Sequence, residues 1–525
     1  MALSLNAEQK EITKILSGKE QYIIPPYQRA YSWEEEQCEA LWEDLKNAYL
    51  TNKDEGYFLG NIVIAKSREE KNRLEVIDGQ QRLISITLLI KVLLHFNPDS
   101  TYLKEAIYIY GKKSNDIPET RLKTNVFEEK DSLFLKNVIE TPLDKIYEFD
   151  NTKDNNFKKN ILYFYSEITK FSKANNIEDF SDFLLDNVSL LPIESEDTNQ
   201  DNAREKALKI FETINNRGKD LSNSDIFKAN LYAMALNNLE QDEFINRWKR
   251  LDSDCDNIGY DVERIFKIYS YQIRGQRGIK SSEIGLRDFF KKTEYTPFKY
   301  KKYNEIMDDL FSIVKAVEFF NTTKRTEGLN ELPKWFQLID IYTNNYPKDL
   351  MIVYLAHKIN TDNFVNDTIR FSKSLVRYCY FQGATTNIKQ YIYDLTIKVI
   401  HNEWEEYYPS NLNDRSYKYL GRLYKGFGLL GSYLNPNQKS VYPYNLKRMR
   451  DIVNFWNEDY WNFDTIGNII ATDLTPKEIL DSDKTSKFED INDLRHNFND
   501  WNINNHIERQ EILKNRFIEF FKESK

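Results

Sequence analysis

Runs and periodic spacings of apolar residues predict a first unit of mixed helix and strand in the N-terminal part of the chain. Residues 7–18 have the pattern of a short helix, and residues 60–65 and 74–77 are short apolar runs typical of strands. Residues 83–94 are apolar on almost every side, which predicts a helix buried in a core. The order of these elements indicates an α/β unit.

An extended segment precedes the first long helix of this unit. Residues 25–33 read Pro-Pro-Tyr-Gln-Arg-Ala-Tyr-Ser-Trp, and we call them the arm. Paired prolines force an extended backbone at its start. Ser32 and Glu35 have the spacing of a capping box, which predicts that a helix begins here. The residues expected on the buried face of that helix are Cys38, Leu41, Trp42, Leu45 and Tyr49.

Residues 78–82, Asp-Gly-Gln-Gln-Arg, connect the second predicted strand to the buried helix, and we call them the turn. A helix N-terminus presents free backbone N–H groups and therefore favours anions. We expect Asp78 to cap the helix, Gly79 to let a ligand approach the backbone, and Arg82 to supply positive charge. The alternative is a capped helix that carries surface glutamines.

Residues 211–228 predict a helix–loop–helix corner farther along the chain. One helix is expected to end near Asn215 with Gly218 as its C-cap, and Ser222 is expected to cap the next helix with Asp225 in the box position. The corner is either purely structural or presents side chains to a ligand. The ligand-facing candidates are Asn215, Arg217 and Lys228.

The rest of the chain reads as largely helical. Residues 100–200 are expected to be mostly helical and polar, with an acidic loop near 194–202, and residues 236–400 are helical throughout. The sequence therefore predicts an α+β protein with an N-terminal domain (1–235), a helical domain (236–400) and a C-terminal domain (401–525).

Composition limits the class of protein. The chain has 525 residues, of which 41% are hydrophobic, and its formal net charge of -9 gives no global attraction to nucleic acid. Its three cysteines form no Cys-x-x-Cys pair, which argues against disulfides and a cysteine zinc site. We find no signal peptide and no apolar run long enough for a membrane span, so we expect a cytoplasmic protein with no membrane partner.

A local positive segment stands out against this acidic background. Residues 411–450 hold eight basic side chains and one acid, Asp414, with seven aromatic residues between them. Basic groups neutralise phosphates and aromatic rings stack on bases, so this composition favours DNA binding over an acidic-protein partner or an intramolecular surface. The predicted DNA-binding residues are Arg415, Lys418, Arg422, Lys425, Lys447, Arg448 and Arg450.

Three motifs together carry a resemblance: Ile-Pro-Pro-Tyr-Gln-Arg at 24–29, Asp-Gly-Gln-Gln-Arg-Leu at 78–83, and residues 211–228. Over residues 8–235 the chain resembles the ParB-like N-terminal domain of the GmrSD-type, modification-dependent (type IV) restriction family. The resemblance implies NTP binding or hydrolysis, with Mg²⁺, at a site in which Asp78 and Arg82 are catalytic. The implied nucleotide-binding residues are Gln28, Arg29, Gly79, Gln80, Gln81, Asn215, Arg217, Gly218, Asp225 and Lys228.

The C-terminal region resembles the HNH-like nuclease domain that many members of this family carry. Gly467 and Asn468 match its Gly-Asn stretch, and residues 507–521 resemble its closing helix. The histidine stretch expected shortly before the Gly-Asn pair is missing, because no histidine lies between His401 and His496. An HNH site needs a histidine to activate water, so this nuclease motif is degenerate.

These observations lead to two hypotheses. The first is an NTP-dependent, DNA-binding anti-phage protein that resembles type IV restriction endonucleases and acts on double-stranded DNA, plain or modified. The second is a non-nucleolytic sensor of nucleotide and DNA that recruits a partner nuclease or toxin. Self-association, the identity of the NTP and DNA cleavage by the chain itself stay open.

Overall fold

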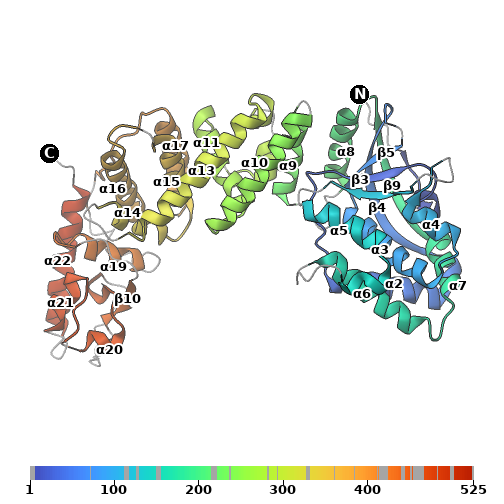
Figure 1. The fold of residues 1–525 in the computed structure, drawn as a ribbon. Helices are drawn as coiled ribbons and strands as arrows, with labels where there is room; N and C mark the ends of the chain where they lie inside the picture. The colour runs from blue at the N-terminus through green and yellow to red at the C-terminus, as the bar shows by residue number, and fades with distance from the viewer. Residues whose placement is uncertain are drawn as a thin grey trace. The chain divides into compact units, whose positions relative to one another are not determined.

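The chain folds into two compact units, residues 1–249 and residues 250–525, in the computed structural model (Figure 1). No described helix combines the length and the apolar character needed to cross a lipid bilayer. The structure describes residues 6–70, 72–111, 117–125, 129–148, 155–214, 222–235, 238–280, 283–291, 294–326, 331–359, 361–382, 385–410, 412, 424–438, 444–449, 452, 466–481, 483–496 and 502–522.

The first unit is built around a mixed sheet. Its strands are β1 (Asn6–Ala7), β2 (Lys10–Glu11), β3 (Gln21–Ile24), β4 (Tyr57–Ser67), β5 (Arg73–Asp78), β8 (Leu122–Thr124) and β9 (Val188–Asp197). The strand order is β1-β9-β4-β5-β3-β8, and β2 also pairs with β9. β3 is parallel to both β5 and β8, β9 is parallel to β4, and β4 is antiparallel to β5. The mixed sheet and the helical remainder confirm the predicted α+β class.

Helices and short segments complete this unit. They are α1 (Ile12–Ile15), α2 (Glu35–Asn52), η1 (Lys53–Glu55), α3 (Gln80–Phe96), α4 (Thr101–Ile107), β6 (Tyr108–Ile109), β7 (Glu119–Thr120), α5 (Glu129–Glu140), η2 (Leu143–Glu148), α6 (Asn156–Phe171), α7 (Ile177–Asp182), η3 (Phe183–Asn187), α8 (Gln200–Ile214) and α9 (Asn223–Met234), and α10 (Asn238–Asn257) contains the boundary between the units.

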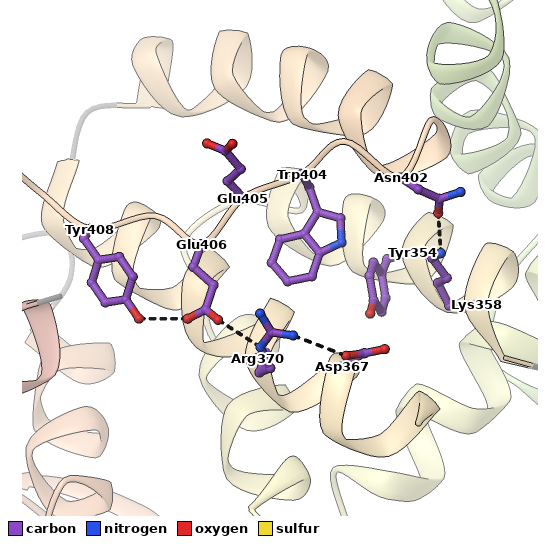
Figure 2. A pocket seen from close by; sticks show the side chains of 9 residues that line it. All are labelled: Tyr354, Lys358, Asp367, Arg370, Asn402, Trp404, Glu405, Glu406 and Tyr408. Atoms are coloured by element: carbon purple, nitrogen blue, oxygen red, sulfur yellow. Dashed lines mark hydrogen bonds and ion pairs between the residues drawn. The ribbon is translucent and has the colours of Figure 1, made fainter. Parts of the chain in front are cut away.

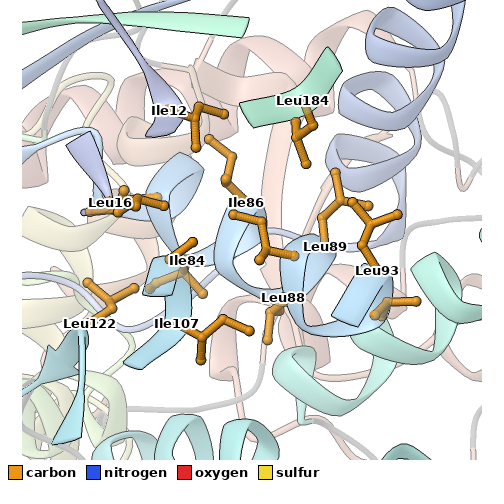
Figure 3. Packing of buried hydrophobic residues seen from close by; sticks show 14 of the residues in the cluster. Ile12, Leu16, Ile84, Ile86, Leu88, Leu89, Leu93, Ile107, Leu122 and Leu184 are labelled. Carbon is orange, nitrogen blue, oxygen red and sulfur yellow. The ribbon is translucent and has the colours of Figure 1, made fainter. Parts of the chain in front are cut away.

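The buried helix α3 organises the core on one face of the sheet. Side chains alternate along a strand, so Leu74 and Val76 of β5 join the core around α3, while Glu75 and Ile77 point to the other face. On that other face α8 packs against β4, β5 and β9. Figure 3 shows the α3 side chains among apolar residues of α1, α4, β8 and η3. The predicted all-round burial of this helix is confirmed.

Three local predictions are wrong. Strand β9 occupies residues 188–197, where the sequence suggested helix and an acidic loop. The helix expected over 7–18 is reduced to the single turn α1, because β1 and β2 pair with β9 instead. The capping box of α2 is formed by Glu34, whose N–H donates to Gln37 Oε1 at 2.8 Å, and not by Ser32 and Glu35.

The second unit is mainly helical. Its elements are α11 (Val262–Arg277), α12 (Leu286–Lys291), η5 (Pro297–Lys299), α13 (Tyr303–Thr323), α14 (Leu332–Asp340), α15 (Tyr346–Lys358), α16 (Phe364–Gln382), α17 (Thr385–Ile400), α19 (Tyr424–Tyr433), β10 (Asn445–Arg448), η8 (Ile466–Asn468), β11 (Ile469–Thr472), α20 (Pro476–Ile479), α21 (Glu489–Arg495) and α22 (Ile503–Phe521). Helices α11, α13, α15 and α17 pack together, and α19 packs on β11. The helical reading of 236–400 is confirmed, whereas a domain boundary near residue 400 stays a prediction.

Candidate functional site

The arm and the turn meet at one edge of the sheet. β3 and β5 are parallel, with Tyr22 opposite Leu74 and Ile23 opposite Glu75, so both strands end at the same edge. The arm follows β3 and the turn follows β5. Ligands of α/β proteins bind outside the carboxyl ends of parallel strands, which makes this edge the leading candidate site.

Gly79 makes the sharp connection from β5 into α3. Its φ of 88° lies in the left-handed region, and a Cβ at this position would stand 2.5 Å from Ile62 Cγ2. Gly79 is also the N-cap residue of α3, so the prediction that Asp78 caps this helix is wrong. By helix geometry, the N–H groups of Gln80, Gln81 and Arg82 have no acceptor within the helix.

Gln80 and Gln81 fasten the arm to the start of α3. The Gln81 carboxamide donates to the Ala30 carbonyl at 3.0 Å and accepts from the Ser32 N–H at 2.8 Å. Gln80 Nε2 donates to the Arg29 carbonyl at 3.3 Å. Both glutamine side chains are buried, each residue being 5% exposed. Gln80 and Gln81, both predicted to touch a nucleotide, therefore form hydrogen bonds with the backbone of the arm. Their direct contact with a ligand stays a prediction.

The remaining arm residues are also firmly held. Gln28 is buried and donates through Nε2 to the Ile77 carbonyl at 2.9 Å, next to the turn. The Tyr31 hydroxyl lies 2.6 Å from Ser85 Oγ on α3. Arg29, in contrast, is exposed. The arm thus presents one guanidinium group to solvent at the edge where the turn lies.

Asp78 and Arg82 form the charged part of the site. Burial raises the pKa of the Asp78 carboxyl, against the opposing effects of the Gly79 N–H and of the Arg82 and Arg29 guanidinium groups. Burial lowers the pKa of Arg82, and Asp78 opposes that change. Arg82 donates through one terminal nitrogen to the Asn61 carbonyl at 2.9 Å, which fixes its direction. One half-buried carboxylate and two guanidinium groups therefore gather at the N-terminus of α3.

The predicted helix–loop–helix corner at residues 211–228 is described only in part. Asn215, Arg217 and Gly218 lie outside the described residues. Asp225 belongs to the α9 cap: its N–H donates to Ser222 Oγ at 3.2 Å, and its carboxylate accepts from the Ser222 hydroxyl at 2.7 Å, as the sequence suggested. A ligand-facing role of this corner stays a prediction.

Lys228 is buried rather than presented to solvent. Only 8% of the residue is exposed, and its ammonium group lies 5.8 Å from the centre of the Trp248 ring. A cation placed over an aromatic face is stabilised there, and this contact favours the buried position of the lysine. Its predicted contact with nucleotide is untested.

One group of contacts beneath the site was missed. Arg204 of α8 forms a buried ion pair with Glu75 of β5 and lies against the rings of Tyr27 and Tyr232. The available signal was Glu75 itself, since a carboxylate inside an otherwise apolar central strand requires a partner.

The structure places two of the predicted C-terminal motifs beside each other. β10 pairs with β11 so that Lys447 lies opposite Ile470 and Arg448 opposite Ile469, the residue after Asn468. Lys425 lies on α19. The other predicted DNA-binding residues, Arg415, Lys418, Arg422 and Arg450, lie outside the described residues.

The Gly467–Asn468 pair is packed against the last helix. A Cβ on Gly467 would lie 2.9 Å from the His506 carbonyl oxygen and 3.1 Å from His506 Cε1. Asn468 is fully buried, and burial lowers the pKa of His506, as does the neighbouring Arg509. A histidine thus lies beside this pair from the C-terminal side of the sequence. Within the described parts of the chain, no three His, Cys, Asp or Glu side chains are grouped to hold a metal ion.

A polar pocket of about 710 Å³ lies in the second unit, and its lining residues include none of the residues predicted from the sequence (Figure 2). The Arg370 guanidinium pairs with Glu406 at 2.9 Å and with Asp367 at 3.5 Å. Glu406 also accepts from the Tyr408 hydroxyl at 2.8 Å. Three carboxylates (Asp367, Glu405 and Glu406) outnumber the two cations (Arg370 and Lys358) in the lining, so the pocket is less suited to a phosphate than the N-terminus of α3.

In the comparisons with known proteins, the matched residues lie within the first unit. A search of the curated proteins gives no match. The family model described as "GmrSD restriction endonuclease, N-terminal domain" matches residues 12–232, which include strands β3, β4, β5, β8 and β9 of the sheet, helix α8 and most of helix α9. Over residues 12–232 the chain is therefore similar to the N-terminal domain of GmrSD restriction endonucleases.

Proposed function

We propose that this protein is an NTP-dependent, DNA-binding defence protein of the restriction type. The match of residues 12–232 to the N-terminal domain of a restriction endonuclease supports a defence role against foreign DNA. The observation that carries the nucleotide part is the convergence of Arg82, Arg29 and the free N–H groups of α3 at one sheet edge. This combination of backbone donors and guanidinium groups suits a phosphate chain.

The residues at this edge also fit a magnesium-bound nucleotide. Asp78 is the one carboxylate of the turn, and it is not used as a helix cap, so it is available to hold Mg²⁺ directly or through water. When bound, Mg²⁺ would neutralise phosphate charge. The free N–H groups at the start of α3 and the guanidinium groups of Arg82 and Arg29 bind phosphate oxygens. The buried Gln80 and Gln81 keep the arm in place during binding.

Calorimetric titration with the common NTPs, with and without Mg²⁺, tests this proposal. We expect metal-dependent binding that is lost in Arg82→Ala and in Asp78→Ala. Arg73→Ala is the matched control, because Arg73 lies on the same strand but is exposed and paired with Glu70. The absence of binding for every NTP under both conditions would reject the nucleotide site.

The DNA part of the proposal rests on the second unit. Lys447 and Arg448 lie on a strand that pairs directly with the strand after the Gly467–Asn468 pair. A basic strand beside a nuclease-like motif suits the phosphate backbone of double-stranded DNA, whose recognition depends on such charges.

A specific observation favours the second hypothesis, a sensor that recruits a partner nuclease or toxin. Asn468 is fully buried and His506 is 8% exposed, so neither is open to a phosphodiester in this arrangement. The sequence also lacks the histidine expected before Gly467. A plasmid-nicking assay on pure protein with Mg²⁺ or Mn²⁺ distinguishes the hypotheses, since only the restriction enzyme would nick DNA without a partner.

A further inference from the structure

The guanidinium group of Arg204 joins α8 to the centre of the sheet. Its Nε donates to Glu75 Oε2 at 2.7 Å, and a terminal nitrogen donates to Glu75 Oε1 at 2.6 Å. The side chains are 5% and 15% exposed, respectively. This fork-shaped pairing fixes both the distance and the orientation of the two groups, which a lysine would not do.

The same guanidinium group also contacts the arm and α9. It lies 5.8 Å from the ring centre of Tyr27 and 5.4 Å from that of Tyr232, and the two ring centres are 5.1 Å apart. Both tyrosines are buried. One side chain on α8 therefore contacts β5, the arm and α9.

Stability alone does not explain this pair. Removing two charges from water costs several kcal/mol per ion, roughly, and apolar replacements of similar volume are often as stable as a buried ion pair. Ile77, which lies on the same face of β5 as Glu75, is apolar and buried. What the ion pair adds over an apolar contact is a single defined geometry.

That geometry bears directly on the candidate site. Glu75 precedes Asp78 by three residues on the same strand, and Tyr27 is followed by Gln28, which binds the Ile77 carbonyl. We propose that Arg204 is a positioning residue that aligns the arm with the turn, so that Arg29 and Arg82 face the same ligand. The ligand assignment rests on the proposed nucleotide function, whereas the alignment itself does not.

The test compares single and paired replacements in the full chain. Arg204→Met leaves the Glu75 carboxylate buried without its partner and should lower the melting temperature. The double variant Glu75→Leu/Arg204→Met should regain the wild-type melting temperature. We nevertheless expect the double variant to bind nucleotide at least about fivefold more weakly, and amide hydrogens of residues 25–33 to exchange at least about fivefold faster.

Two further variants complete the design. Arg204→Lys keeps the charge but loses the fork, so it should fold and still show faster exchange in the arm. Lys206→Met is the matched control, because Lys206 lies on the same helix and pairs with Asp197 at the surface. It should change neither exchange in the arm nor affinity for nucleotide.

The outcomes separate this inference from the proposed function. The positioning role would be overturned if the amide hydrogens of the arm exchanged at the wild-type rate in both Arg204→Lys and the double variant. If the double variant failed to fold, a wild-type exchange rate in the arm of Arg204→Lys would by itself overturn the positioning role. If the wild-type chain bound no nucleotide, the proposed function would fail, and exchange in the arm would still decide the role of Arg204.

Discussion

The Gln81 carboxamide oxygen accepts a hydrogen bond from the backbone N–H of Ser32 at 2.8 Å. This bond, together with that from Gln81 Nε2 to the Ala30 carbonyl, fastens the arm to α3 through one buried side chain. We expect Gln81→Ala to lower the free energy of unfolding by about 1–3 kcal/mol, because backbone groups lose their partners. Chemical denaturation measures this loss.

The control for that prediction is Ser32→Ala, since Ser32 donates mainly through its backbone, which the substitution retains. We expect a change within about 0.5 kcal/mol for this exposed side chain. Equal stability of Gln81→Ala and the wild type would contradict the proposed fastening role.

Gly79→Ala should destabilise the first unit more than an ordinary substitution at a left-handed glycine. Alanine is strained at this positive φ, and its Cβ would also lie 2.5 Å from Ile62 Cγ2. We therefore expect the free energy of unfolding to fall by about 2–4 kcal/mol. Gly18→Ala is matched in backbone angle, with φ 71°, but meets no atom within 4 Å, and should cost about 1 kcal/mol. Thermal unfolding of the two variants decides the point; equal losses would refute the predicted clash.

The buried Asp349 should make the stability of the second unit depend on pH in an unusual direction. Burial raises its pKa to about 6, although Arg264 opposes the shift. A raised carboxyl pKa means that the folded state binds the proton more tightly than the unfolded state, so stability should fall as pH rises from about 4 to 6. In Asp349→Asn this part of the fall should be absent. Denaturation at several pH values measures both curves, and parallel curves would contradict the assignment.

Charge reversal on β10 should weaken DNA binding through loss of phosphate contacts. In Lys447→Glu/Arg448→Glu we expect affinity to fall about equally for different DNA sequences, and the salt dependence to decrease by about two counterions. Lys484→Glu, an exposed lysine of the same unit, is the control. Unchanged affinity in the double variant at several salt concentrations would remove β10 from the DNA surface.

The isolated chain should cut DNA weakly or not at all. The expected upstream histidine is absent from the sequence, and Asn468 is fully buried. The assay uses pure protein, Mg²⁺ or Mn²⁺, NTP, and both plain and modified phage DNA. Robust cutting that disappears in a folded Asn468→Ala variant would overturn this prediction and favour the restriction enzyme over the sensor.

Sequence reasoning succeeded where local apolar patterns determine structure. The uniformly apolar residues of α3 and the apolar run ending at Ile77 predicted a buried strand, a turn and a buried helix, and all three are present. It failed at β9, because residues 188–197 become a strand only through pairing with β4, far away in sequence. Local composition in that segment, with three acidic residues at its end, favours a loop.

At the candidate site, too, local features could be predicted from the sequence and long-range contacts could not. The position of the turn followed from the sequence, but the partners of its side chains did not. Gln80 and Gln81 point to the arm because β3 and β5 are parallel neighbours, a fact that spacing along the chain does not contain. Likewise, Arg204 and Glu75 are 129 residues apart, so only the tertiary fold identifies them as partners.

The position of β9 between β4 and the N-terminal strands has a consequence for biosynthesis. β4 can acquire its parallel neighbour only after residue 197 has left the ribosome, so until then its edge lies open to pairing with other chains. Long-range parallel pairing of this kind forms slowly. A nascent chain that stalls before residue 197 therefore exposes an unpaired edge of β4 that can associate with other chains. A fragment prepared to study the arm and the turn should for the same reason extend through β9, so that this edge is covered.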